Sequence, residues 1–270
     1  MTYTMTIPSL GLGMRSIPEN SYGKAIIQSS LDSGYRLFDT SPKYHNEKML
    51  GDVIRDSNID RQEIFVITKI GIETIVKGDP FILDSIESSL NNLNIDYIDL
   101  LLLEHSVNKY NVNAWDTLIN VQQNMFDNLK NKIKAIGVSN YSIRDINELI
   151  QMTNVPPMFH QYEVSPFLQN QQMAQFCTYN KIKIISHTSI ANYTNITHNT
   201  IKALCLKRNV TPSQLMIRWG VQRGYAVLVG TGNIDHLEEN MDISKFCLSF
   251  HDYEFMNKMN DDKSFAVFIR

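Results

Sequence analysis

The sequence predicts an α/β protein built as a single (β/α)8 TIM barrel that spans residues 1–270. Eight short apolar runs of β-type residues follow one another along the chain, with amphipathic helical segments between them. Some runs, such as IDLLLLE at 98–104, are continuously apolar, as parallel strands covered on both faces are. No linker, charge block or Gly/Ser tract divides the chain. Strand and helix alternating in one undivided chain favour a closed barrel, a fold that often runs to about 250 residues as one domain.

The predicted strands are spread along the whole chain. They lie at residues 9–14, 35–40, 64–69, 98–104, 133–140, 158–164, 182–188 and 226–231. A doubly wound open sheet is the competing architecture, and it would need a glycine-rich phosphate loop after one strand. The nearest candidate, GLGMRS at 11–16, has Ser16 in place of the third glycine and is not followed directly by a helix. We therefore favour the closed barrel.

Amphipathic helices are expected between the strands. The segment 79–94 opens on an Asp-Pro pair, typical of a helix cap followed by a first-turn residue. The apolar stripe of this helix consists of Phe81, Ile82, Ile86 and Leu90. Further helices are expected at residues 112–131 and 211–223.

Composition is that of an ordinary globular protein with room for a large core, because 43% of the residues are hydrophobic and 20% are charged. The net charge of −3 gives no electrostatic reason to expect nucleic acid or an anionic membrane as a partner. No apolar run approaches the ~20 residues needed to cross a bilayer. We expect a monomer that acts on a small molecule.

Cysteine usage indicates a reducing compartment. Cys177, Cys205 and Cys247 are odd in number and widely spaced, so free buried thiols are expected rather than disulfides. The first residues, MTYTMTIPSL, lack the basic start and apolar core of a signal peptide. We therefore expect a cytoplasmic protein, in which the sequons at Asn192 and Asn195 are chance matches.

Polar side chains gather at the carboxyl ends of the predicted strands, where the active sites of such barrels lie. They are, in chain order, Asp39, Lys69, Glu104, His105, Ser139, Asn140, Gln161, Glu163, His187 and Thr188. Any one of them could be a capping group or a solvated surface charge. Five successive strand ends that carry titratable or amide groups to one face favour a functional site.

The stretch FDTSPKYHNE, residues 38–47, is the densest of these strand ends. It could be a simple polar turn, in which Asp39 caps, Pro42 bends the chain and Tyr44 packs on the surface. Its position at the mouth of a predicted barrel favours a catalytic segment instead.

With these residues in order, the chain resembles the aldo-keto reductase family over nearly its whole length. The motifs are GLG, GYRLFDTSPKYHNEKMLG, FVITK, DSIESSLNNLNIDYIDLLLLE, IKAIGVSNY, HQYEVSPF and LEEN. The run from Asp84 to Leu103 and the segment AIGVSN are the most specific. The resemblance implies a nicotinamide cofactor bound across the barrel mouth without a Rossmann fold, which accounts for the missing glycine fingerprint.

The resemblance also implies a catalytic group made of Asp39, Tyr44 and Lys69. Reduction of a carbonyl by hydride leaves an alkoxide that needs a proton, and a free phenol, with a pKa of about 10, is a weak acid. A nearby ammonium favours the phenolate, so that Lys69 would make Tyr44 a better proton donor, with Asp39 holding Lys69 in place.

The fourth catalytic position departs from the family pattern. The usual LIHWP is replaced by LLEHS, which puts Glu104 at the histidine position and His105 at the tryptophan position, on the substrate side. A branch of the family that reduces steroid enones also carries glutamate there, because a protonated carboxyl can donate a strong hydrogen bond to a substrate carbonyl. The alternative is that His105 turns inward, which would require a bulge, since adjacent strand residues point to opposite faces.

The cofactor positions are partly kept. Ser139, Asn140 and Gln161 match residues that hold the nicotinamide carboxamide, and His187 lies where an aromatic ring stacks on the nicotinamide. Gly13 and Met14, at the end of the first strand, and Asp39 also match cofactor-contacting positions.

The positions that bind the adenosine end are more altered. The usual PKS is replaced by VGT at 229–231, and His236 stands where an arginine grips the 2′-phosphate. Backbone N–H groups of the turn at Gly230, Thr231 and Gly232 could still bind phosphate. Glu239 and Asn240 match adenine-binding positions. We therefore expect NADPH as the cofactor, with NADH as a further candidate.

The resemblance implies an oxidoreductase that reduces aldehydes or ketones with Tyr44 as the proton donor. Two alternatives stay open, namely an enone reductase that uses Glu104 and a catalytically inactive, nucleotide-binding or structural homologue. The family's substrate-covering tail is short or absent, which predicts an open site.

Overall fold

The computed structural model describes residues 5–191, 198–262 and 264–265. Eight parallel strands close into one barrel in chain order, with the first strand paired to the last. The strands are β1 (Leu10–Gly13), β2 (Leu37–Asp39), β3 (Phe65–Ile70), β4 (Ile98–Leu103), β5 (Ile133–Ser139), β6 (Phe159–Glu163), β7 (Lys183–His187) and β8 (Ala226–Val229). The predicted barrel is confirmed, and each strand lies within one or two residues of its predicted bounds.

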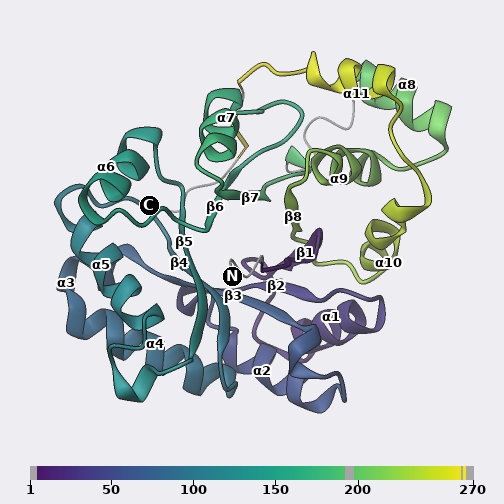
Figure 1. Cartoon of the computed structure of the whole chain (residues 1–270). Coiled ribbons are helices and arrows are strands. Elements are labelled where there is room, and N and C mark those ends of the chain that lie inside the picture. The colour runs from purple at the N-terminus through teal and green to yellow at the C-terminus, as the bar shows by residue number, and fades with distance from the viewer. Residues whose placement is uncertain (1–4, 192–197, 263, 266–270) are drawn as a thin grey trace.

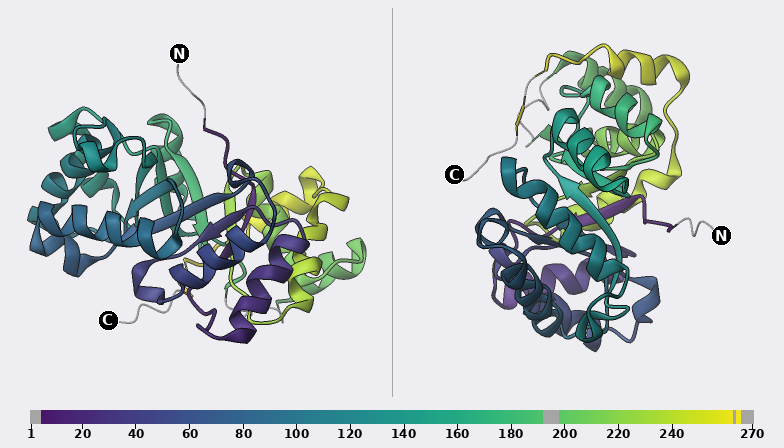
Figure 2. Two further views of the ribbon diagram at one scale, coloured as in Figure 1. Left: turned by 90° about the horizontal axis from the view of Figure 1, so that it is seen from below. Right: turned by 60° about the vertical axis from the view of Figure 1, so that its left-hand side comes forward.

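Helices surround the barrel on its outside (Figure 1), and the other two views show the same arrangement (Figure 2). They are α1 (Ser21–Asp32), α2 (Glu47–Asp56), α3 (Ile72–Lys77), α4 (Asp79–Leu93), α5 (Asn111–Gln122), α6 (Ile143–Thr153), α7 (Gln171–Tyr179), α8 (Asn199–Arg208), α9 (Pro212–Gln222), α10 (Asp235–Met241) and α11 (Phe250–Asn257). No helix in the described residues is long and apolar enough to cross a membrane.

Two apolar cores follow from the alternation of side chains along the strands. A large outer core lies between strands and helices, and a smaller inner core fills the barrel. The inner core consists of Leu37, Phe65, Ile67, Leu100, Leu102, Ala135, Phe159, Ile185, Ala226 and Leu228. Met5, Ile7 and Met158 pack against it. The polar residues at the carboxyl ends of the strands lie directly next to this inner core.

Close packing inside the barrel explains why position 137 is a glycine. A Cβ atom on Gly137 would lie 2.5 Å from the Phe159 carbonyl oxygen and 2.8 Å from a Leu102 methyl group. Strand β5 therefore has no room for a side chain at this level, and Gly137 lets β5 approach its neighbours.

The helix predictions need three corrections. In α4, Phe81 is 49% exposed and lies outside the buried stripe, and Gly78 rather than Asp79 is the N-cap. The helix predicted at 112–131 ends at Gln122, because Asn124 adopts a left-handed conformation with φ of 62°. The helix predicted at 211–223 needs no such correction, because α9 begins after Thr211, which is its N-cap and forms a reciprocal capping box with Gln214.

The three thiols are free, as predicted, but they are not all buried. Cys177 is buried, Cys205 is intermediate and Cys247 is exposed. Cys247 accepts a hydrogen bond from the Arg218 guanidinium, with 2.7 Å between Nη2 and Sγ. The sequons at Asn192 and Asn195 lie outside the described residues.

Candidate active site

Strand periodicity carries a set of polar residues to the carboxyl-terminal mouth of the barrel. Leu37 in β2, Ile67 in β3 and Leu102 in β4 belong to the inner core, and the next inward position on each strand is polar. Continuing the alternation to the ends of β2 through β8 gives Asp39, Lys69, Glu104, Ser139, Gln161, His187 and Gly230. The barrel thus brings together residues that are far apart in the sequence.

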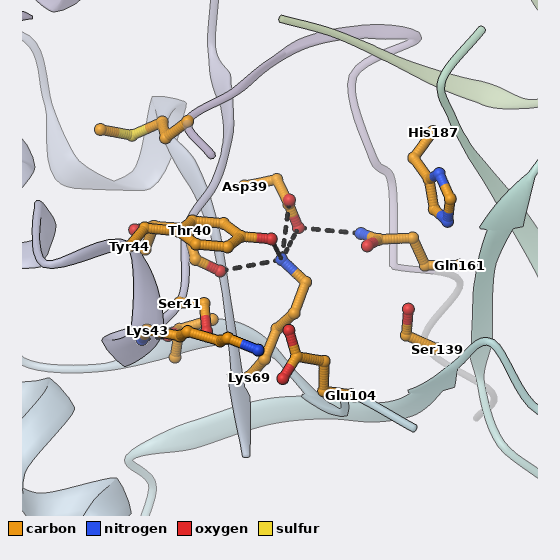
Figure 3. A network of polar contacts seen from close by, with 12 residues as sticks. Asp39, Thr40, Ser41, Lys43, Tyr44, Lys69, Glu104, Ser139, Gln161 and His187 are labelled. Atoms are coloured by element: carbon orange, nitrogen blue, oxygen red, sulfur yellow. Dashed lines mark hydrogen bonds and ion pairs between the residues drawn. The ribbon is translucent and has the colours of Figure 1, made fainter. Parts of the chain in front are cut away.

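Asp39 and Lys69 form a buried ion pair at the centre of this mouth. The Lys69 ammonium donates to both Asp39 carboxylate oxygens, at 2.8 and 2.7 Å, and to the Thr40 carbonyl oxygen at 2.9 Å (Figure 3). Burial by itself lowers the pKa of Lys69, but the attraction of Asp39 and Tyr44 outweighs it, so the pKa is raised. Lys69 is therefore charged and fixed in position.

Tyr44 stands beside this ion pair. It ends the short 3-10 helix η1 (Pro42–Tyr44), and its hydroxyl lies 3.5 Å from the Lys69 ammonium, at the outer limit of a hydrogen bond. Burial raises the pKa of Tyr44; Lys69 opposes the rise, whereas Asp39 and Glu104 add to it. Lys69 does favour the phenolate, as expected, but burial has the larger effect on this pKa.

Gln161 connects the ion pair to the opposite side of the barrel. Its side-chain amide, on β6, donates to Asp39 at 2.8 Å. Asp39 therefore accepts hydrogen bonds from β3 and β6 at once (Figure 3). This network orients the Asp39 carboxylate without the help of solvent.

Glu104 follows β4 directly and keeps the inward alternation of Leu100 and Leu102. Figure 3 shows its carboxylate directed toward the space around Lys69. Its negative charge raises the pKa of both Tyr44 and Lys69.

His105 is half-buried beside the same mouth. Burial lowers its pKa, which Glu104 opposes and the positive charges of Lys43 and Arg15 reinforce. Its place in the alternation is that of the outward residues Leu101 and Leu103, which lie in the outer core. The geometry therefore supports Glu104 rather than His105 as the inward group.

The predicted nicotinamide residues lie together at the ends of β5 and β7. Asn140, in a left-handed conformation, donates to the Ser139 hydroxyl at 3.1 Å and contacts His187 Nε2 through Oδ1 at 3.0 Å. Burial, reinforced by the charges of Lys69 and Arg15, lowers the pKa of His187 to about 3. The neutral ring can therefore donate from Nε2 to Asn140 and accept at Nδ1 from the Thr188 hydroxyl, 3.0 Å away.

Gly13 and Met14 lie where β1 ends. Gly13 has no side chain, and a Cβ there would meet only the β8 backbone near Val229, at 3.7 Å. The Met14 side chain is fully buried in the outer core, so it does not line the mouth. Its carbonyl accepts from Asn46 at 2.8 Å, and its N–H donates to the Asp39 carbonyl at 2.9 Å.

The turn after β8 is tied by backbone and side-chain bonds. Gly230 and Gly232 are exposed, and the Thr231 hydroxyl is buried and bonds within the turn. His236 Nδ1 lies 3.5 Å from that hydroxyl. The Tyr22 hydroxyl, from α1, donates to the Gly232 carbonyl at 2.7 Å and fixes the turn from outside.

Helix α10 carries Glu239 and Asn240. Glu239 accepts from the Thr211 hydroxyl at 2.7 Å. Asn240 is 1% exposed, and neither its amide nitrogen nor its oxygen has a hydrogen-bond partner among the described residues. A buried amide without partners is costly, so this one is suited to a polar ligand.

The sequence reasoning did not anticipate that Ser264 and Phe265 contact the site. Glu163, at the end of β6, accepts hydrogen bonds from the Phe265 backbone N–H at 2.6 Å and the Ser264 hydroxyl at 2.5 Å. Phe265 packs edge-on against Phe167, with ring centroids 6.3 Å apart. Ser264 and Phe265 are therefore held beside the mouth. Their contact with Glu163 joins residues about a hundred positions apart in the chain.

Lys43 is a further residue at the mouth that the sequence reasoning missed. It precedes Tyr44 directly, and that position was the available signal. In the part of the chain that the structure describes, no group of three or more His, Cys, Asp or Glu could hold a metal ion.

The barrel and its buried Asp–Lys pair beside a tyrosine define the class of protein, and comparison with known proteins agrees. The model of the aldo/keto reductase family matches residues 9–261. The chain therefore belongs to the aldo/keto reductase family, whose named relatives are oxidoreductases and which uses NADPH.

Individual relatives are moderately similar. The chain is 31% identical to the methylglyoxal reductase DkgA of Escherichia coli O157:H7, over 95% of this chain and 91% of that protein. The structure of MGS-M4, an aldo-keto reductase from a deep-sea metagenome library, matches with a TM-score of 0.89 at 29% identity, covering 96% and 94% of the two chains. A variant of Gox0644 solved with NADPH matches with a TM-score of 0.87 at 26% identity, covering 95% and 90%.

Proposed function

We propose that this protein reduces small aldehydes or ketones with NADPH and that Tyr44 is the proton donor. The observation that carries the proposal is the position of the Lys69 ammonium, 2.7 Å from Asp39 and 3.5 Å from the Tyr44 hydroxyl, at the mouth of the barrel. A buried ion pair is costly to maintain, and its placement against a phenol suits acid catalysis.

Each residue of this group has a distinct part in the reaction. Burial keeps the Tyr44 hydroxyl protonated, so it can donate to the oxygen of a substrate carbonyl. The phenolate left after proton transfer would be stabilised by the adjacent Lys69 ammonium. Asp39 and the Thr40 carbonyl hold Lys69 in position, and Gln161 holds Asp39. The nicotinamide cofactor supplies the hydride when bound.

The residues present fit such a cofactor. The unpaired amide of Asn240 offers a donor and an acceptor to a nucleobase, as the resemblance to the family implies. Ser139 and Asn140 offer polar groups at the mouth for the nicotinamide amide, with His187 beside them. The backbone of the turn at Gly230 and Gly232 is exposed and can meet phosphate oxygens.

A second candidate function is the reduction of a carbon–carbon double bond in an enone. It is favoured by one observation, the inward alternation of Glu104 beside Tyr44. A protonated Glu104 would give the substrate oxygen a second hydrogen-bond donor and so favour hydride arrival at the β-carbon. His105 would then line the substrate side.

Turnover of Tyr44→Phe tests the proposal. Loss of nicotinamide absorbance should be followed with methylglyoxal, aromatic aldehydes and a cyclic enone, and the variant should lose a factor of about 10²–10⁴ in kcat. Tyr179→Phe is the matched control, because Tyr179 is 87% exposed on α7. Full activity in Tyr44→Phe would show that Tyr44 is not the proton donor. Quenching of protein fluorescence by NADPH without any turnover would identify an inactive nucleotide-binding homologue.

A further inference from the structure

Lys43 places a positive charge at the mouth of the barrel. It stands between Pro42 and Tyr44 in the turn η1, and its side chain is exposed. Figure 3 shows its amine end directed toward the Glu104 carboxylate, on the same side of the site as the Tyr44 ring. Within the ranges 5–191, 198–262 and 264–265, Lys43 forms no ion pair.

A neighbouring lysine behaves differently. Lys48, five residues further along the chain and in α2, pairs with Asp52 at 2.9 Å. Lys48 is thus held in an ion pair by a carboxylate of the protein, whereas Lys43 points toward Glu104 at the mouth without forming an ion pair among the described residues.

The balance of charges at the mouth favours an anion. Lys69 and Asp39 neutralise each other within their buried pair. The positive charges of Lys43 and Arg15 both act on His105, lowering its pKa, and Arg15 acts in the same way on His187. Glu104 is the carboxylate whose charge opposes them at His105, and the Glu163 carboxylate is already engaged by Ser264 and Phe265. Two positive charges thus act on this part of the mouth against the one carboxylate of Glu104, which favours a negatively charged substituent there.

We propose that Lys43 selects carbonyl substrates that carry a negatively charged group, a carboxylate or a phosphate. The inference rests on the proposed reductase function and names its substrate class. Lys43 and Tyr44 are consecutive in one tight turn, so a substrate oxygen that accepts from Tyr44 brings its substituent next to the ammonium. Lysine can follow an anion of variable position, because its charge sits on a flexible stem.

A pair of matched substrates tests the selection. We would compare para-carboxybenzaldehyde with its methyl ester, which differ in charge and share the aldehyde. The readout is the ratio of kcat/KM for the acid to that for the ester, in wild type, Lys43→Gln and Lys48→Gln. Each variant removes one positive charge, so the comparison isolates position from net charge.

We expect the acid-to-ester ratio to fall about three- to tenfold in Lys43→Gln and to stay at the wild-type value in Lys48→Gln, because Lys43 is exposed and its attraction is partly screened. High salt should lower the wild-type ratio and leave that of Lys43→Gln unchanged. Glyceraldehyde phosphate compared with glyceraldehyde in the same proteins distinguishes phosphate from carboxylate as the preferred anion.

Equal ratios in wild type and Lys43→Gln for both anion pairs would overturn the inference. If wild type reduces nothing, the proposed function fails separately, and binding decides the inference. In that case the affinity of the protein–NADP+ complex for para-carboxybenzaldehyde and its ester would be measured by fluorescence quenching. A preference for the acid that depends on Lys43 supports the anion site, and equal affinities reject it.

Discussion

The two sides of the barrel mouth are built in different ways. On the side of β2 and β3, the Asp39–Lys69 pair is buried and satisfied, and Asp39 accepts hydrogen bonds from both Lys69 and Gln161. On the side of β8 and α10, glycines are exposed, and Asn240 is buried with no partner among the described residues for either polar atom. On the first side the protein itself supplies the hydrogen bonds of the ion pair. On the second side polar groups of the protein remain available to hydrogen-bond a ligand.

This difference corresponds to what each side would do. A proton donor has to be held in position before the substrate arrives, and preorganised charges provide that. A nucleotide-binding surface has to leave donors and acceptors available for the ligand. Two departures from the family pattern, at Gly230 and His236, lie on this second side, and another, at Glu104, lies on the first. The chain thus keeps Asp39, Tyr44 and Lys69, whereas both positions expected to grip the 2′-phosphate have changed.

The largest expected effect comes from breaking the buried ion pair between Asp39 and Lys69. Lys69→Met leaves the Asp39 carboxylate buried without its cation, so the free energy of unfolding should fall by about 3–5 kcal/mol. The double variant Asp39→Asn, Lys69→Met should recover part of this loss. Chemical denaturation measures both, with the exposed Lys183→Met as the control. A loss below that of the control would mean that the pair contributes little to the fold.

The next effect concerns the phosphate end of the nucleotide. We expect wild type to prefer NADPH to NADH less than is usual in the family, because glycine and histidine, rather than lysine and arginine, stand at Gly230 and His236. His236→Arg should raise the ratio of the NADH to the NADPH dissociation constant by about 10- to 100-fold, the value of a charge-assisted phosphate contact. His251→Arg, on the exposed face of α11, adds the same charge elsewhere and should leave the ratio unchanged. A strong NADPH preference in wild type would show that another basic residue binds the phosphate.

The unpaired amide allows a test in which stability and binding move in opposite directions. Asn240→Leu removes two unsatisfied polar atoms at similar volume, so the nucleotide-free protein should become more stable by about 1–3 kcal/mol while NADPH binding weakens. Asn111→Leu is the contrast. Asn111 is equally buried, but it accepts from the Val107 N–H and donates to the Ser106 hydroxyl, so its loss should destabilise the protein. Destabilisation by Asn240→Leu would mean that its amide is satisfied in solution.

The smallest expected effect distinguishes Glu104 from His105. Glu104→His should shift the ratio of aldehyde to enone turnover toward aldehydes by about tenfold, the value of one hydrogen bond of ~1.4 kcal/mol in the transition state. His105→Ala should change this ratio less. The reverse result, with His105→Ala inactive and Glu104→His unchanged, would show that His105 is the inward residue.

Much of this architecture could be predicted because it depends on local pattern. Continuous apolar runs identify the strands, and the two-residue period along β4 indicates that Glu104 follows Leu100 and Leu102 inward. The assignment of Asp39, Tyr44 and Lys69 to one site came from the family resemblance, and the structure brings these three side chains together.

Other features depend on contacts that no local pattern contains. The helix expected at 112–131 stops early because Asn124 adopts a left-handed conformation, which asparagine tolerates but does not require. The pKa of Tyr44 rises because packing around the hydroxyl outweighs the charge of Lys69. The bond between Glu163 and Phe265 joins residues about a hundred positions apart, which the sequence does not connect.

The distribution of the site along the chain has a consequence for protein engineering. Asp39, Tyr44, Lys69 and Glu104 all precede the loop between α5 and β5, whereas the groups predicted to hold most of the nucleotide follow it. Met125, in that loop, is 69% exposed. A chain divided at Met125 would yield one fragment with the acid and another with most of the cofactor surface, joined again through the β4–β5 and β8–β1 pairings, the packing of α5 on α6 and the Gln161–Asp39 hydrogen bond. Turnover would then report the association of two fused partners, as in split-enzyme complementation.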